Sequence, residues 1–104
     1  MYAAIRRYNA YQGSTEELVR RVNTGFIPLL SQQPGFLAYF GVDPGDGSIL
    51  TVSIFEDKAG ADASSRAAQE WVKSNLSSMI KNAPVIVTGE VVLHKAATGE
   101  VAAS

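Results

Sequence analysis

The chain has 104 residues, of which 46% are hydrophobic and 18% are charged, and its formal net charge at pH 7 is −1. This length and composition are typical of one globular domain, and the small net charge without a basic cluster excludes a nucleic-acid footprint. The sequence has no cysteine and a single histidine, which excludes disulfides, thiol catalysis and a histidine-rich metal site within one subunit.

The first half of the chain predicts a strand followed by a helix. Residues 2–9 alternate in character, as expected of a half-buried strand. The segment Ser14-Thr15-Glu16-Glu17 has the form of a capping box and precedes apolar residues at helical spacing, which predicts a helix that ends before Pro34-Gly35. Because Pro28 lacks a backbone donor, we expect a kink or a looser turn near residues 25–28.

The second half predicts a hairpin, a helix and a final strand. Residues 36–42 and 49–55 flank a turn rich in glycine and aspartate, and both have the composition of strands. Asp57 is placed to cap a second helix that extends to about residues 81–82. Residues 85–94 alternate again and predict a fourth strand.

The order strand, helix, strand, strand, helix, strand predicts an α+β fold, the ferredoxin-like βαββαβ sandwich, with a four-stranded antiparallel sheet and two helices on one face. We expect this domain to cover residues 1–94. Residues 95–104 are expected to form a flexible tail or an arm that orders on a partner. The sequence shows no apolar run long enough for a membrane span and no basic-then-apolar leader, so we expect a cytoplasmic protein.

The alternation sorts the strand residues onto two faces of the sheet. We expect the aliphatic face, which includes Leu50, Val52 and Ile54, to pack under the helices. The uncovered face would then hold Tyr2, Arg6, Tyr8, Thr51, Ser53, Phe55, Thr88, Glu90, Val92 and His94, with Tyr39 a candidate. This set is too aromatic for solvent and too polar for an ordinary core. It therefore predicts a homodimer in which two sheets close a barrel around a polar cavity.

Three stretches carry a resemblance to a known superfamily: Tyr2-Ala-Ala-Ile-Arg-Arg-Tyr8, Gln33-Pro34-Gly35-Phe36, and Phe55-Glu56-Asp57 before an alanine- and serine-rich helix. Over residues 2–94 the chain resembles the dimeric α+β barrel superfamily, and within it the antibiotic biosynthesis monooxygenase-like domains. The resemblance implies a ferredoxin-like dimeric barrel. Proteins of this kind include cofactor-independent oxygenases, haem-degrading enzymes and domains without assigned chemistry, so the resemblance supports the fold more than the function.

Arg6 and Glu90 are expected on neighbouring strands, and their roles have two interpretations. They form a buried ion pair, or Arg6 binds an anionic or enolate oxygen while Glu90 acts as a base. Tyr8 and Tyr39 are suited to hydrogen-bonding such a substrate and equally to a dimer contact. His94 is either a general base near neutral pH or an exposed residue at the end of a strand.

Asn9 and Trp71 are similar to an asparagine and a tryptophan of the haem-degrading members of the superfamily. Those enzymes use them beside a helical histidine that ligates iron, and this chain has no histidine on the second helix. Haem degradation is therefore the less favoured activity. The alternative is that Trp71 is a core aromatic and Asn9 a turn residue.

The second helix begins with many small side chains. Either it packs closely on the sheet, which we favour because interiors tolerate few voids, or it covers a pocket whose helical side includes Ser65, Ala68 and Trp71.

Two classes of function remain. The first is a cofactor-independent monooxygenase acting on an aromatic or polyketide-like metabolite. The second is a non-catalytic dimeric ligand-binding or accessory domain that holds a small apolar or aromatic ligand. The catalytic candidates are Arg6, Asn9, Trp71 and His94, and the ligand-binding candidates are Tyr8, Tyr39, Ser53, Ser65, Ala68 and Glu90, with no metal ligand and no bound cofactor expected.

Overall fold

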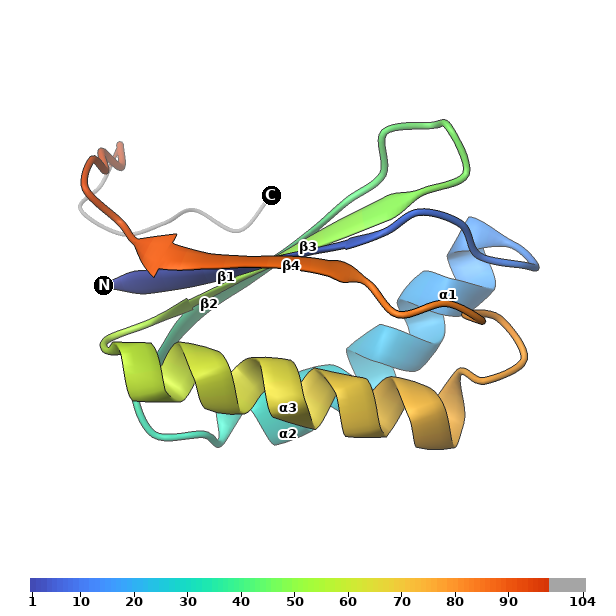
Figure 1. Ribbon diagram of the computed structural model, residues 1–104, viewed down its shortest axis with the longest axis horizontal. Helices are drawn as coiled ribbons and strands as arrows, with labels where there is room; N and C mark the ends of the chain where they lie inside the picture. Colours follow the sequence, from blue (N-terminus) through green and yellow to red (C-terminus); the bar gives the residue numbers. More distant parts are fainter. Residues whose placement is uncertain (98–104) are drawn as a thin grey trace.

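The computed structural model describes residues 1–97 of the chain. Its elements follow the order β1 (Tyr2–Tyr8), α1 (Thr15–Arg21), the π-helix η1 (Val22–Phe26), α2 (Ile27–Ser31), β2 (Phe36–Val42), β3 (Ile49–Phe55), α3 (Lys58–Asn75) and β4 (Val85–Glu90). Because α1, η1 and α2 are continuous, they make up the single first helical segment that the sequence predicts. The predicted α+β ferredoxin-like fold is confirmed, with the helices in one layer and the sheet in the other (Figure 1).

The sheet has the strand order β2-β3-β1-β4, and each neighbouring pair is antiparallel. In the central strand β1, Arg6 lies opposite Thr51 of β3 on one side and opposite Ile86 of β4 on the other. Ser53 of β3 lies opposite Tyr39 of β2. Directly opposed residues share a face, so the register gathers residues from several strands on the same side of the sheet.

The last strand is shorter than predicted. β4 ends at Glu90, and residues 91–97 form no further strand, although the Val91 amide still donates to the Met1 carbonyl at 2.9 Å. Most of the expected tail, residues 98–104, lies outside the described residues. None of the helices within residues 1–97 has the length and apolarity that a membrane crossing requires.

The two predicted helix caps are present. The Ser14 hydroxyl accepts a hydrogen bond from the Glu17 amide at 3.1 Å, and the Asp57 carboxylate accepts one from the Gly60 amide at 2.8 Å. Helix α3 ends at Asn75, earlier than residues 81–82. The chain turns after Leu76, which lets Met79 and Ile80 pack against the buried Tyr8 ring.

The looser turn that Pro28 predicts is present as η1, which begins at Val22, three residues before the expected range, and ends within that range at Phe26. The Ile27 amide donates to the Val22 carbonyl, five residues back, which is the hydrogen bond of a π-helix. Pro28 has no amide proton for the α-helical bond at the next position. The extra residue per turn changes which side chains of this segment face the sheet.

The two faces of the sheet are the reverse of the expected ones. Arg6 is 1% exposed and Phe55 is fully buried, both under the helices, whereas Val85 and Val87 are 56% and 59% exposed on the open face. The physical reason is the close approach of α3. A Cβ on Gly60 would lie only 2.7 Å from Cδ2 of Phe55, so a helix with small side chains here fits against large residues from the sheet.

The expectation that the aliphatic residues of β3 pack under the helices is therefore wrong. They lie on the open face together with apolar residues of the other strands, as the register requires: Ala3, Ile5, Ala38, Phe40, Val42, Leu50, Val52, Ile54, Val85 and Val87. We call this set the open sheet face. The aromatic and polar set lies instead between the sheet and the helices.

Candidate functional site

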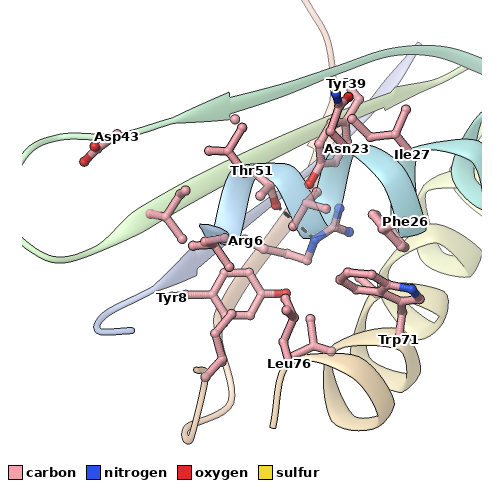
Figure 2. A pocket seen from close by; sticks show the side chains of 18 residues that line it. Arg6, Tyr8, Asn23, Phe26, Ile27, Tyr39, Asp43, Thr51, Trp71 and Leu76 are labelled. Carbon is pink, nitrogen blue, oxygen red and sulfur yellow. Dashed lines mark hydrogen bonds between the residues drawn. The ribbon is translucent and has the colours of Figure 1, made fainter. Parts of the chain in front are cut away.

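A cavity of about 260 Å³ lies between the sheet and the helical layer. Figure 2 shows side chains from both layers converging on it, with Arg6 and Tyr8 of β1 facing Trp71 and Leu76 across the space. The lining residues are Arg6, Tyr8, Leu18, Val19, Val22, Asn23, Phe26, Ile27, Tyr39, Gly41, Asp43, Ile49, Thr51, Ala68, Trp71, Val72, Leu76 and Ile80. The pocket is therefore formed within one chain, under the helices.

Arg6 is the charged group at the buried end of this cavity. Its Nε donates to Thr51 Oγ1 at 3.2 Å, its Nη1 to Ser65 Oγ at 3.2 Å and its Nη2 to Ser53 Oγ at 2.6 Å. All three partners are neutral hydroxyls, and no carboxylate among residues 1–97 forms an ion pair with Arg6. A buried charge without a counter-charge is strongly unfavourable, so the site is poised to take an anionic group.

The expected pairing of Arg6 with Glu90 is wrong. Glu90 lies opposite Tyr2, at the far end of β4, and is exposed, whereas Ile86 occupies the position opposite Arg6. The β1–β4 register therefore separates the two charged groups. Glu90 does not line the cavity, and the positive charge of Arg6 is not cancelled from this strand.

Two tyrosines surround the guanidinium. Burial raises the pKa of the Tyr8 phenol above 10.0, and the nearby Arg6 charge only partly offsets this effect. Burial likewise raises the pKa of Tyr39, even though the Arg6 charge and hydrogen bonds with Thr51 and Arg6 act in the opposite direction. Both phenols are therefore protonated near neutral pH and act as hydrogen-bond donors rather than as bases.

An aromatic group closes the helical side of the cavity. The rings of Phe26 and Trp71 lie 5.6 Å apart, and Phe26 meets Tyr39 edge to face at 6.0 Å. Trp71 reaches this position because Gly25 in η1 has no side chain, since a Cβ there would lie 2.6 Å from Cζ2 of the indole. The cavity thus combines one buried cation with flat apolar surfaces, which suits an aromatic ligand that carries an acidic oxygen.

No protein-family model matches the sequence, and no curated protein is significantly similar to it. Solved structures do match. NE2512 from Nitrosomonas europaea, of unknown function, is 21% identical with a TM-score of 0.71, over 94% of this chain and 95% of that one. The monooxygenase ActVA-Orf6 of Streptomyces coelicolor, in complex with nanaomycin D, is 17% identical with a TM-score of 0.64, over 90% and 92%.

A third match is a mutant of SnoaB, a cofactor-independent oxygenase from Streptomyces nogalater, at 14% identity and a TM-score of 0.58, over 92% of this chain and 95% of that one. The chain has the fold of the antibiotic biosynthesis monooxygenase-like domains. At these identities the match concerns the fold of such domains, and the chemistry has to be argued from the residues of this chain.

This fold brings most of the sequence-predicted site residues together. Arg6, Tyr8, Tyr39, Ala68 and Trp71 line the cavity. Ser53 and Ser65 reach it indirectly, because each accepts a hydrogen bond from Arg6. The structure combines the two alternatives considered for the second helix: α3 packs closely on the sheet near Gly60, and Ala68 and Trp71, but not Ser65, line the cavity further along it.

Three predicted residues do not line the cavity: Asn9, Glu90 and His94. β1 ends at Tyr8, and the exposed Asn9 accepts a hydrogen bond from Nε of its neighbour Arg7 at 3.2 Å. His94 is exposed beyond the end of β4. Asn9 and Trp71 therefore do not share one pocket, as their likeness to haem-degrading enzymes would require.

Sequence reasoning missed Asn23 and Asp43 as cavity residues. Asn23 lies in η1, where the π-helical turn adds a residue and so places a polar side chain between apolar positions at the cavity. The only sequence signal for this shift is the pair Gly25 and Pro28 within one helical segment. Asp43 follows β2, is exposed, and accepts a hydrogen bond from the Gly45 amide at 2.8 Å.

Proposed function

We propose that this protein is a cofactor-independent monooxygenase that oxidises a small aromatic or polyketide-like compound bound in the cavity as an oxyanion. The observation that carries the proposal is Arg6, a 1% exposed cation that lines an apolar cavity and whose hydrogen-bond partners within residues 1–97 are neutral. A guanidinium has five N–H groups, and the three hydroxyls and Tyr39 leave at least one for a ligand.

Tyr39 indicates how acidic the ligand must be. Its phenol lies beside Arg6, yet burial outweighs the guanidinium and keeps its pKa above 10.0. A simple phenol in the same cavity would therefore stay protonated. The proposed substrate is a more acidic compound, in which a carbonyl group conjugated with the hydroxyl stabilises the enolate or phenolate before it enters the cavity.

The proposed reaction needs no electron donor beyond the substrate. A ring CH₂ that lies between two aromatic rings and is conjugated through them with a ketone reacts as its enolate with O₂: the CH₂ carbon becomes a second ketone, one oxygen atom is retained and the other leaves as water with the two hydrogens of the CH₂. Arg6 would hold the enolate oxygen in a site shielded from water, where fixed charges act most strongly. The fold shared with ActVA-Orf6 and SnoaB supports this class of chemistry.

We further propose that the protein is a homodimer formed through the open sheet face. Ile5, Val42, Val85 and Val87 are 37%, 48%, 56% and 59% exposed on this face, and they belong to three different strands. Contiguous apolar surface of this kind is typical of an interaction site, and a second copy of the same face would cover it symmetrically. In this arrangement the two cavities lie on the outer sides of the paired sheets.

A non-catalytic ligand-binding domain is the second candidate. The observation that favours it concerns proton transfer at neutral pH: within residues 1–97, the titratable side chains that line the cavity are Arg6, Tyr8, Tyr39 and the exposed Asp43. An ionised ligand would bind to such a site equally well without being converted.

Oxygen uptake with 1,8-dihydroxyanthrone tests the proposal. The expected result is uptake above the uncatalysed rate, with conversion to the quinone, and a loss of about 100-fold or more in Arg6→Met. Arg7→Met is the matched control, because Arg7 is the neighbouring arginine on the opposite face, and it should retain the rate. Binding without oxygen uptake would support the ligand-binding domain, whereas equal rates in the wild type and Arg6→Met would overturn the proposal.

A further inference from the structure

A second hollow, of about 380 Å³, adjoins the cavity on the outer side of Tyr8. Three residues line both spaces: Tyr8, Val72 and Ile80. The remaining lining residues of this groove are Gln69, Lys73, Lys81, Asn82, Ala83 and Pro84. The groove therefore begins where the cavity ends, between the second half of α3 and the loop that leads into β4.

The groove is basic and amide-rich. Lys73 comes from the last turn of α3 and Lys81 from the following loop, so lysines from two separate segments line one space. In the part of the chain that the structure describes, no acidic side chain lines the groove and neither lysine forms an ion pair. In a chain whose net charge is −1, this concentration of positive charge is a local feature.

We infer that this groove is a subsite for a carboxylate or phosphate group at the end of a ligand whose aromatic part occupies the cavity. The inference rests on the proposed function, because it requires that the cavity bind the aromatic part. Gln69 and Asn82 supply amide donors beside the two lysines, and oxyanions accept from both kinds of group. Arg6 is reserved for the acidic ring oxygen, since it lines the cavity and not the groove, whereas the two lysines line the groove and not the cavity.

The shared residues define how such a ligand would lie. Val72 and Ile80 give apolar contacts on the way out of the cavity, and the Tyr8 ring, which is 5% exposed, lies between the two spaces. A linker of a few atoms passing this ring would carry the anionic end from an apolar environment into a solvated, basic one. Such a compound places each polar group where the protein offers a complementary partner.

The test uses 4-(naphthalen-1-yloxy)butanoate and its methyl ester, which differ in the terminal charge. Isothermal titration calorimetry on the full chain should show the acid binding about three- to tenfold more tightly than the ester, as two partly solvated ion pairs would give. Lys73→Gln/Lys81→Gln should remove this difference and leave the affinity for the ester unchanged. Lys58→Gln/Lys95→Gln makes the same change in net charge away from the groove and should retain the difference.

The other outcomes separate the two proposals. If the ester binds and the acid binds no better, or if the difference survives in Lys73→Gln/Lys81→Gln, the cavity stands and the subsite is overturned. If the difference disappears instead in Arg6→Met, the carboxylate is held in the cavity, which also overturns the subsite. If neither compound binds, the subsite is overturned, whereas the proposed function, which needs an acidic ring oxygen that both compounds lack, is decided separately by the oxygen-uptake assay. Inorganic phosphate binding alone as tightly as the acid would identify a free anion as the ligand and overturn the linked one.

Discussion

Nη2 of Arg6 donates to Oγ of Ser53 at 2.6 Å, the shortest of the three hydrogen bonds that hold this guanidinium. Both residues are buried, on neighbouring strands. A serine hydroxyl orients the guanidinium but carries no charge, whereas a carboxylate at the same place would neutralise it. The positive charge of Arg6 is therefore fixed in direction and left available to the cavity.

Ser53→Asp should cancel that charge. The new carboxylate would pair with Arg6, so we expect the affinity for an acidic aromatic ligand to fall at least tenfold while the fold is retained, because a buried ion pair with good geometry is tolerated. Ser53→Ala is the control: it should lower the free energy of unfolding by about 1 kcal/mol and weaken ligand binding much less. Calorimetric titration of both variants and the wild type measures these affinities. Equal affinities of Ser53→Asp and the wild type would contradict this role for the charge of Arg6.

Gly25→Ala should destabilise the protein by about 1–3 kcal/mol, because the new methyl group would lie 2.6 Å from the Trp71 indole. Trp71→Phe removes the atoms in conflict, so the double variant should lose less stability than the sum of the two single variants. Gly41→Ala, whose Cβ would have no neighbour within 4 Å, should change stability by less than 1 kcal/mol. Chemical denaturation of the wild type and the four variants measures the free energies of unfolding. Strict additivity of the losses in Gly25→Ala and Trp71→Phe would argue against a steric role of Gly25.

The raised pKa values of Tyr8 and Tyr39 predict a loss of stability in alkali. In the unfolded chain a tyrosine loses its proton near pH 10.0, but in the folded protein burial holds the proton to higher pH. The contribution to stability is therefore complete below pH 10 and decreases as the pH rises through the folded-state pKa values. Tyrosinate absorbance near 295 nm should show a late component that Tyr8→Phe and Tyr39→Phe each reduce, and its absence would contradict the burial of these phenols.

Val87→Lys should prevent dimerisation through the open sheet face. The valine is 59% exposed, so a lysine can be solvated in the single chain but would be buried without a partner in a symmetric sheet-to-sheet contact. Leu29→Lys is the matched control, since Leu29 is 57% exposed on α2 and lies away from this face. Sedimentation velocity should find the wild type and Leu29→Lys as dimers and Val87→Lys as a monomer. A dimer that survives Val87→Lys would place the interface elsewhere.

The element order could be predicted from the sequence because it depends on local signals. Capping by Ser14 and Asp57, the break at Pro34-Gly35 and the glycine-rich hairpin each act over a few residues. The bounds of β2 and β3 were predicted without error for the same reason. Helix α3 was predicted too long because its end depends on how Leu76, Met79 and Ile80 pack against Tyr8, which is a tertiary contact. Strand β4 was predicted too long because it ends at Glu90, opposite Tyr2, the first residue of its partner strand β1.

The orientation of the sheet could not be predicted from alternation alone. A period of two tells which residues share a face, and Arg6, Thr51 and Ser53 were correctly grouped. It does not tell which face meets the helices when both faces are largely apolar. The sequence does contain a steric signal. The small residues at the start of α3 fit against large side chains such as Phe55, which favours the aromatic face under the helix. The aliphatic face needs no helix if a second sheet covers it.

Both layers that line the cavity belong to one chain, and this determines the stoichiometry of ligand binding. The cation, the two phenols and the indole all come from the same polypeptide, so under the proposed function each chain would bind one ligand by itself, whatever the number of chains in the assembly. A mixed assembly of wild-type and Arg6→Met chains would keep activity in proportion to its wild-type content. Occupancy of one site need not report on its neighbour, and saturation should follow a simple hyperbola with a Hill coefficient of about 1.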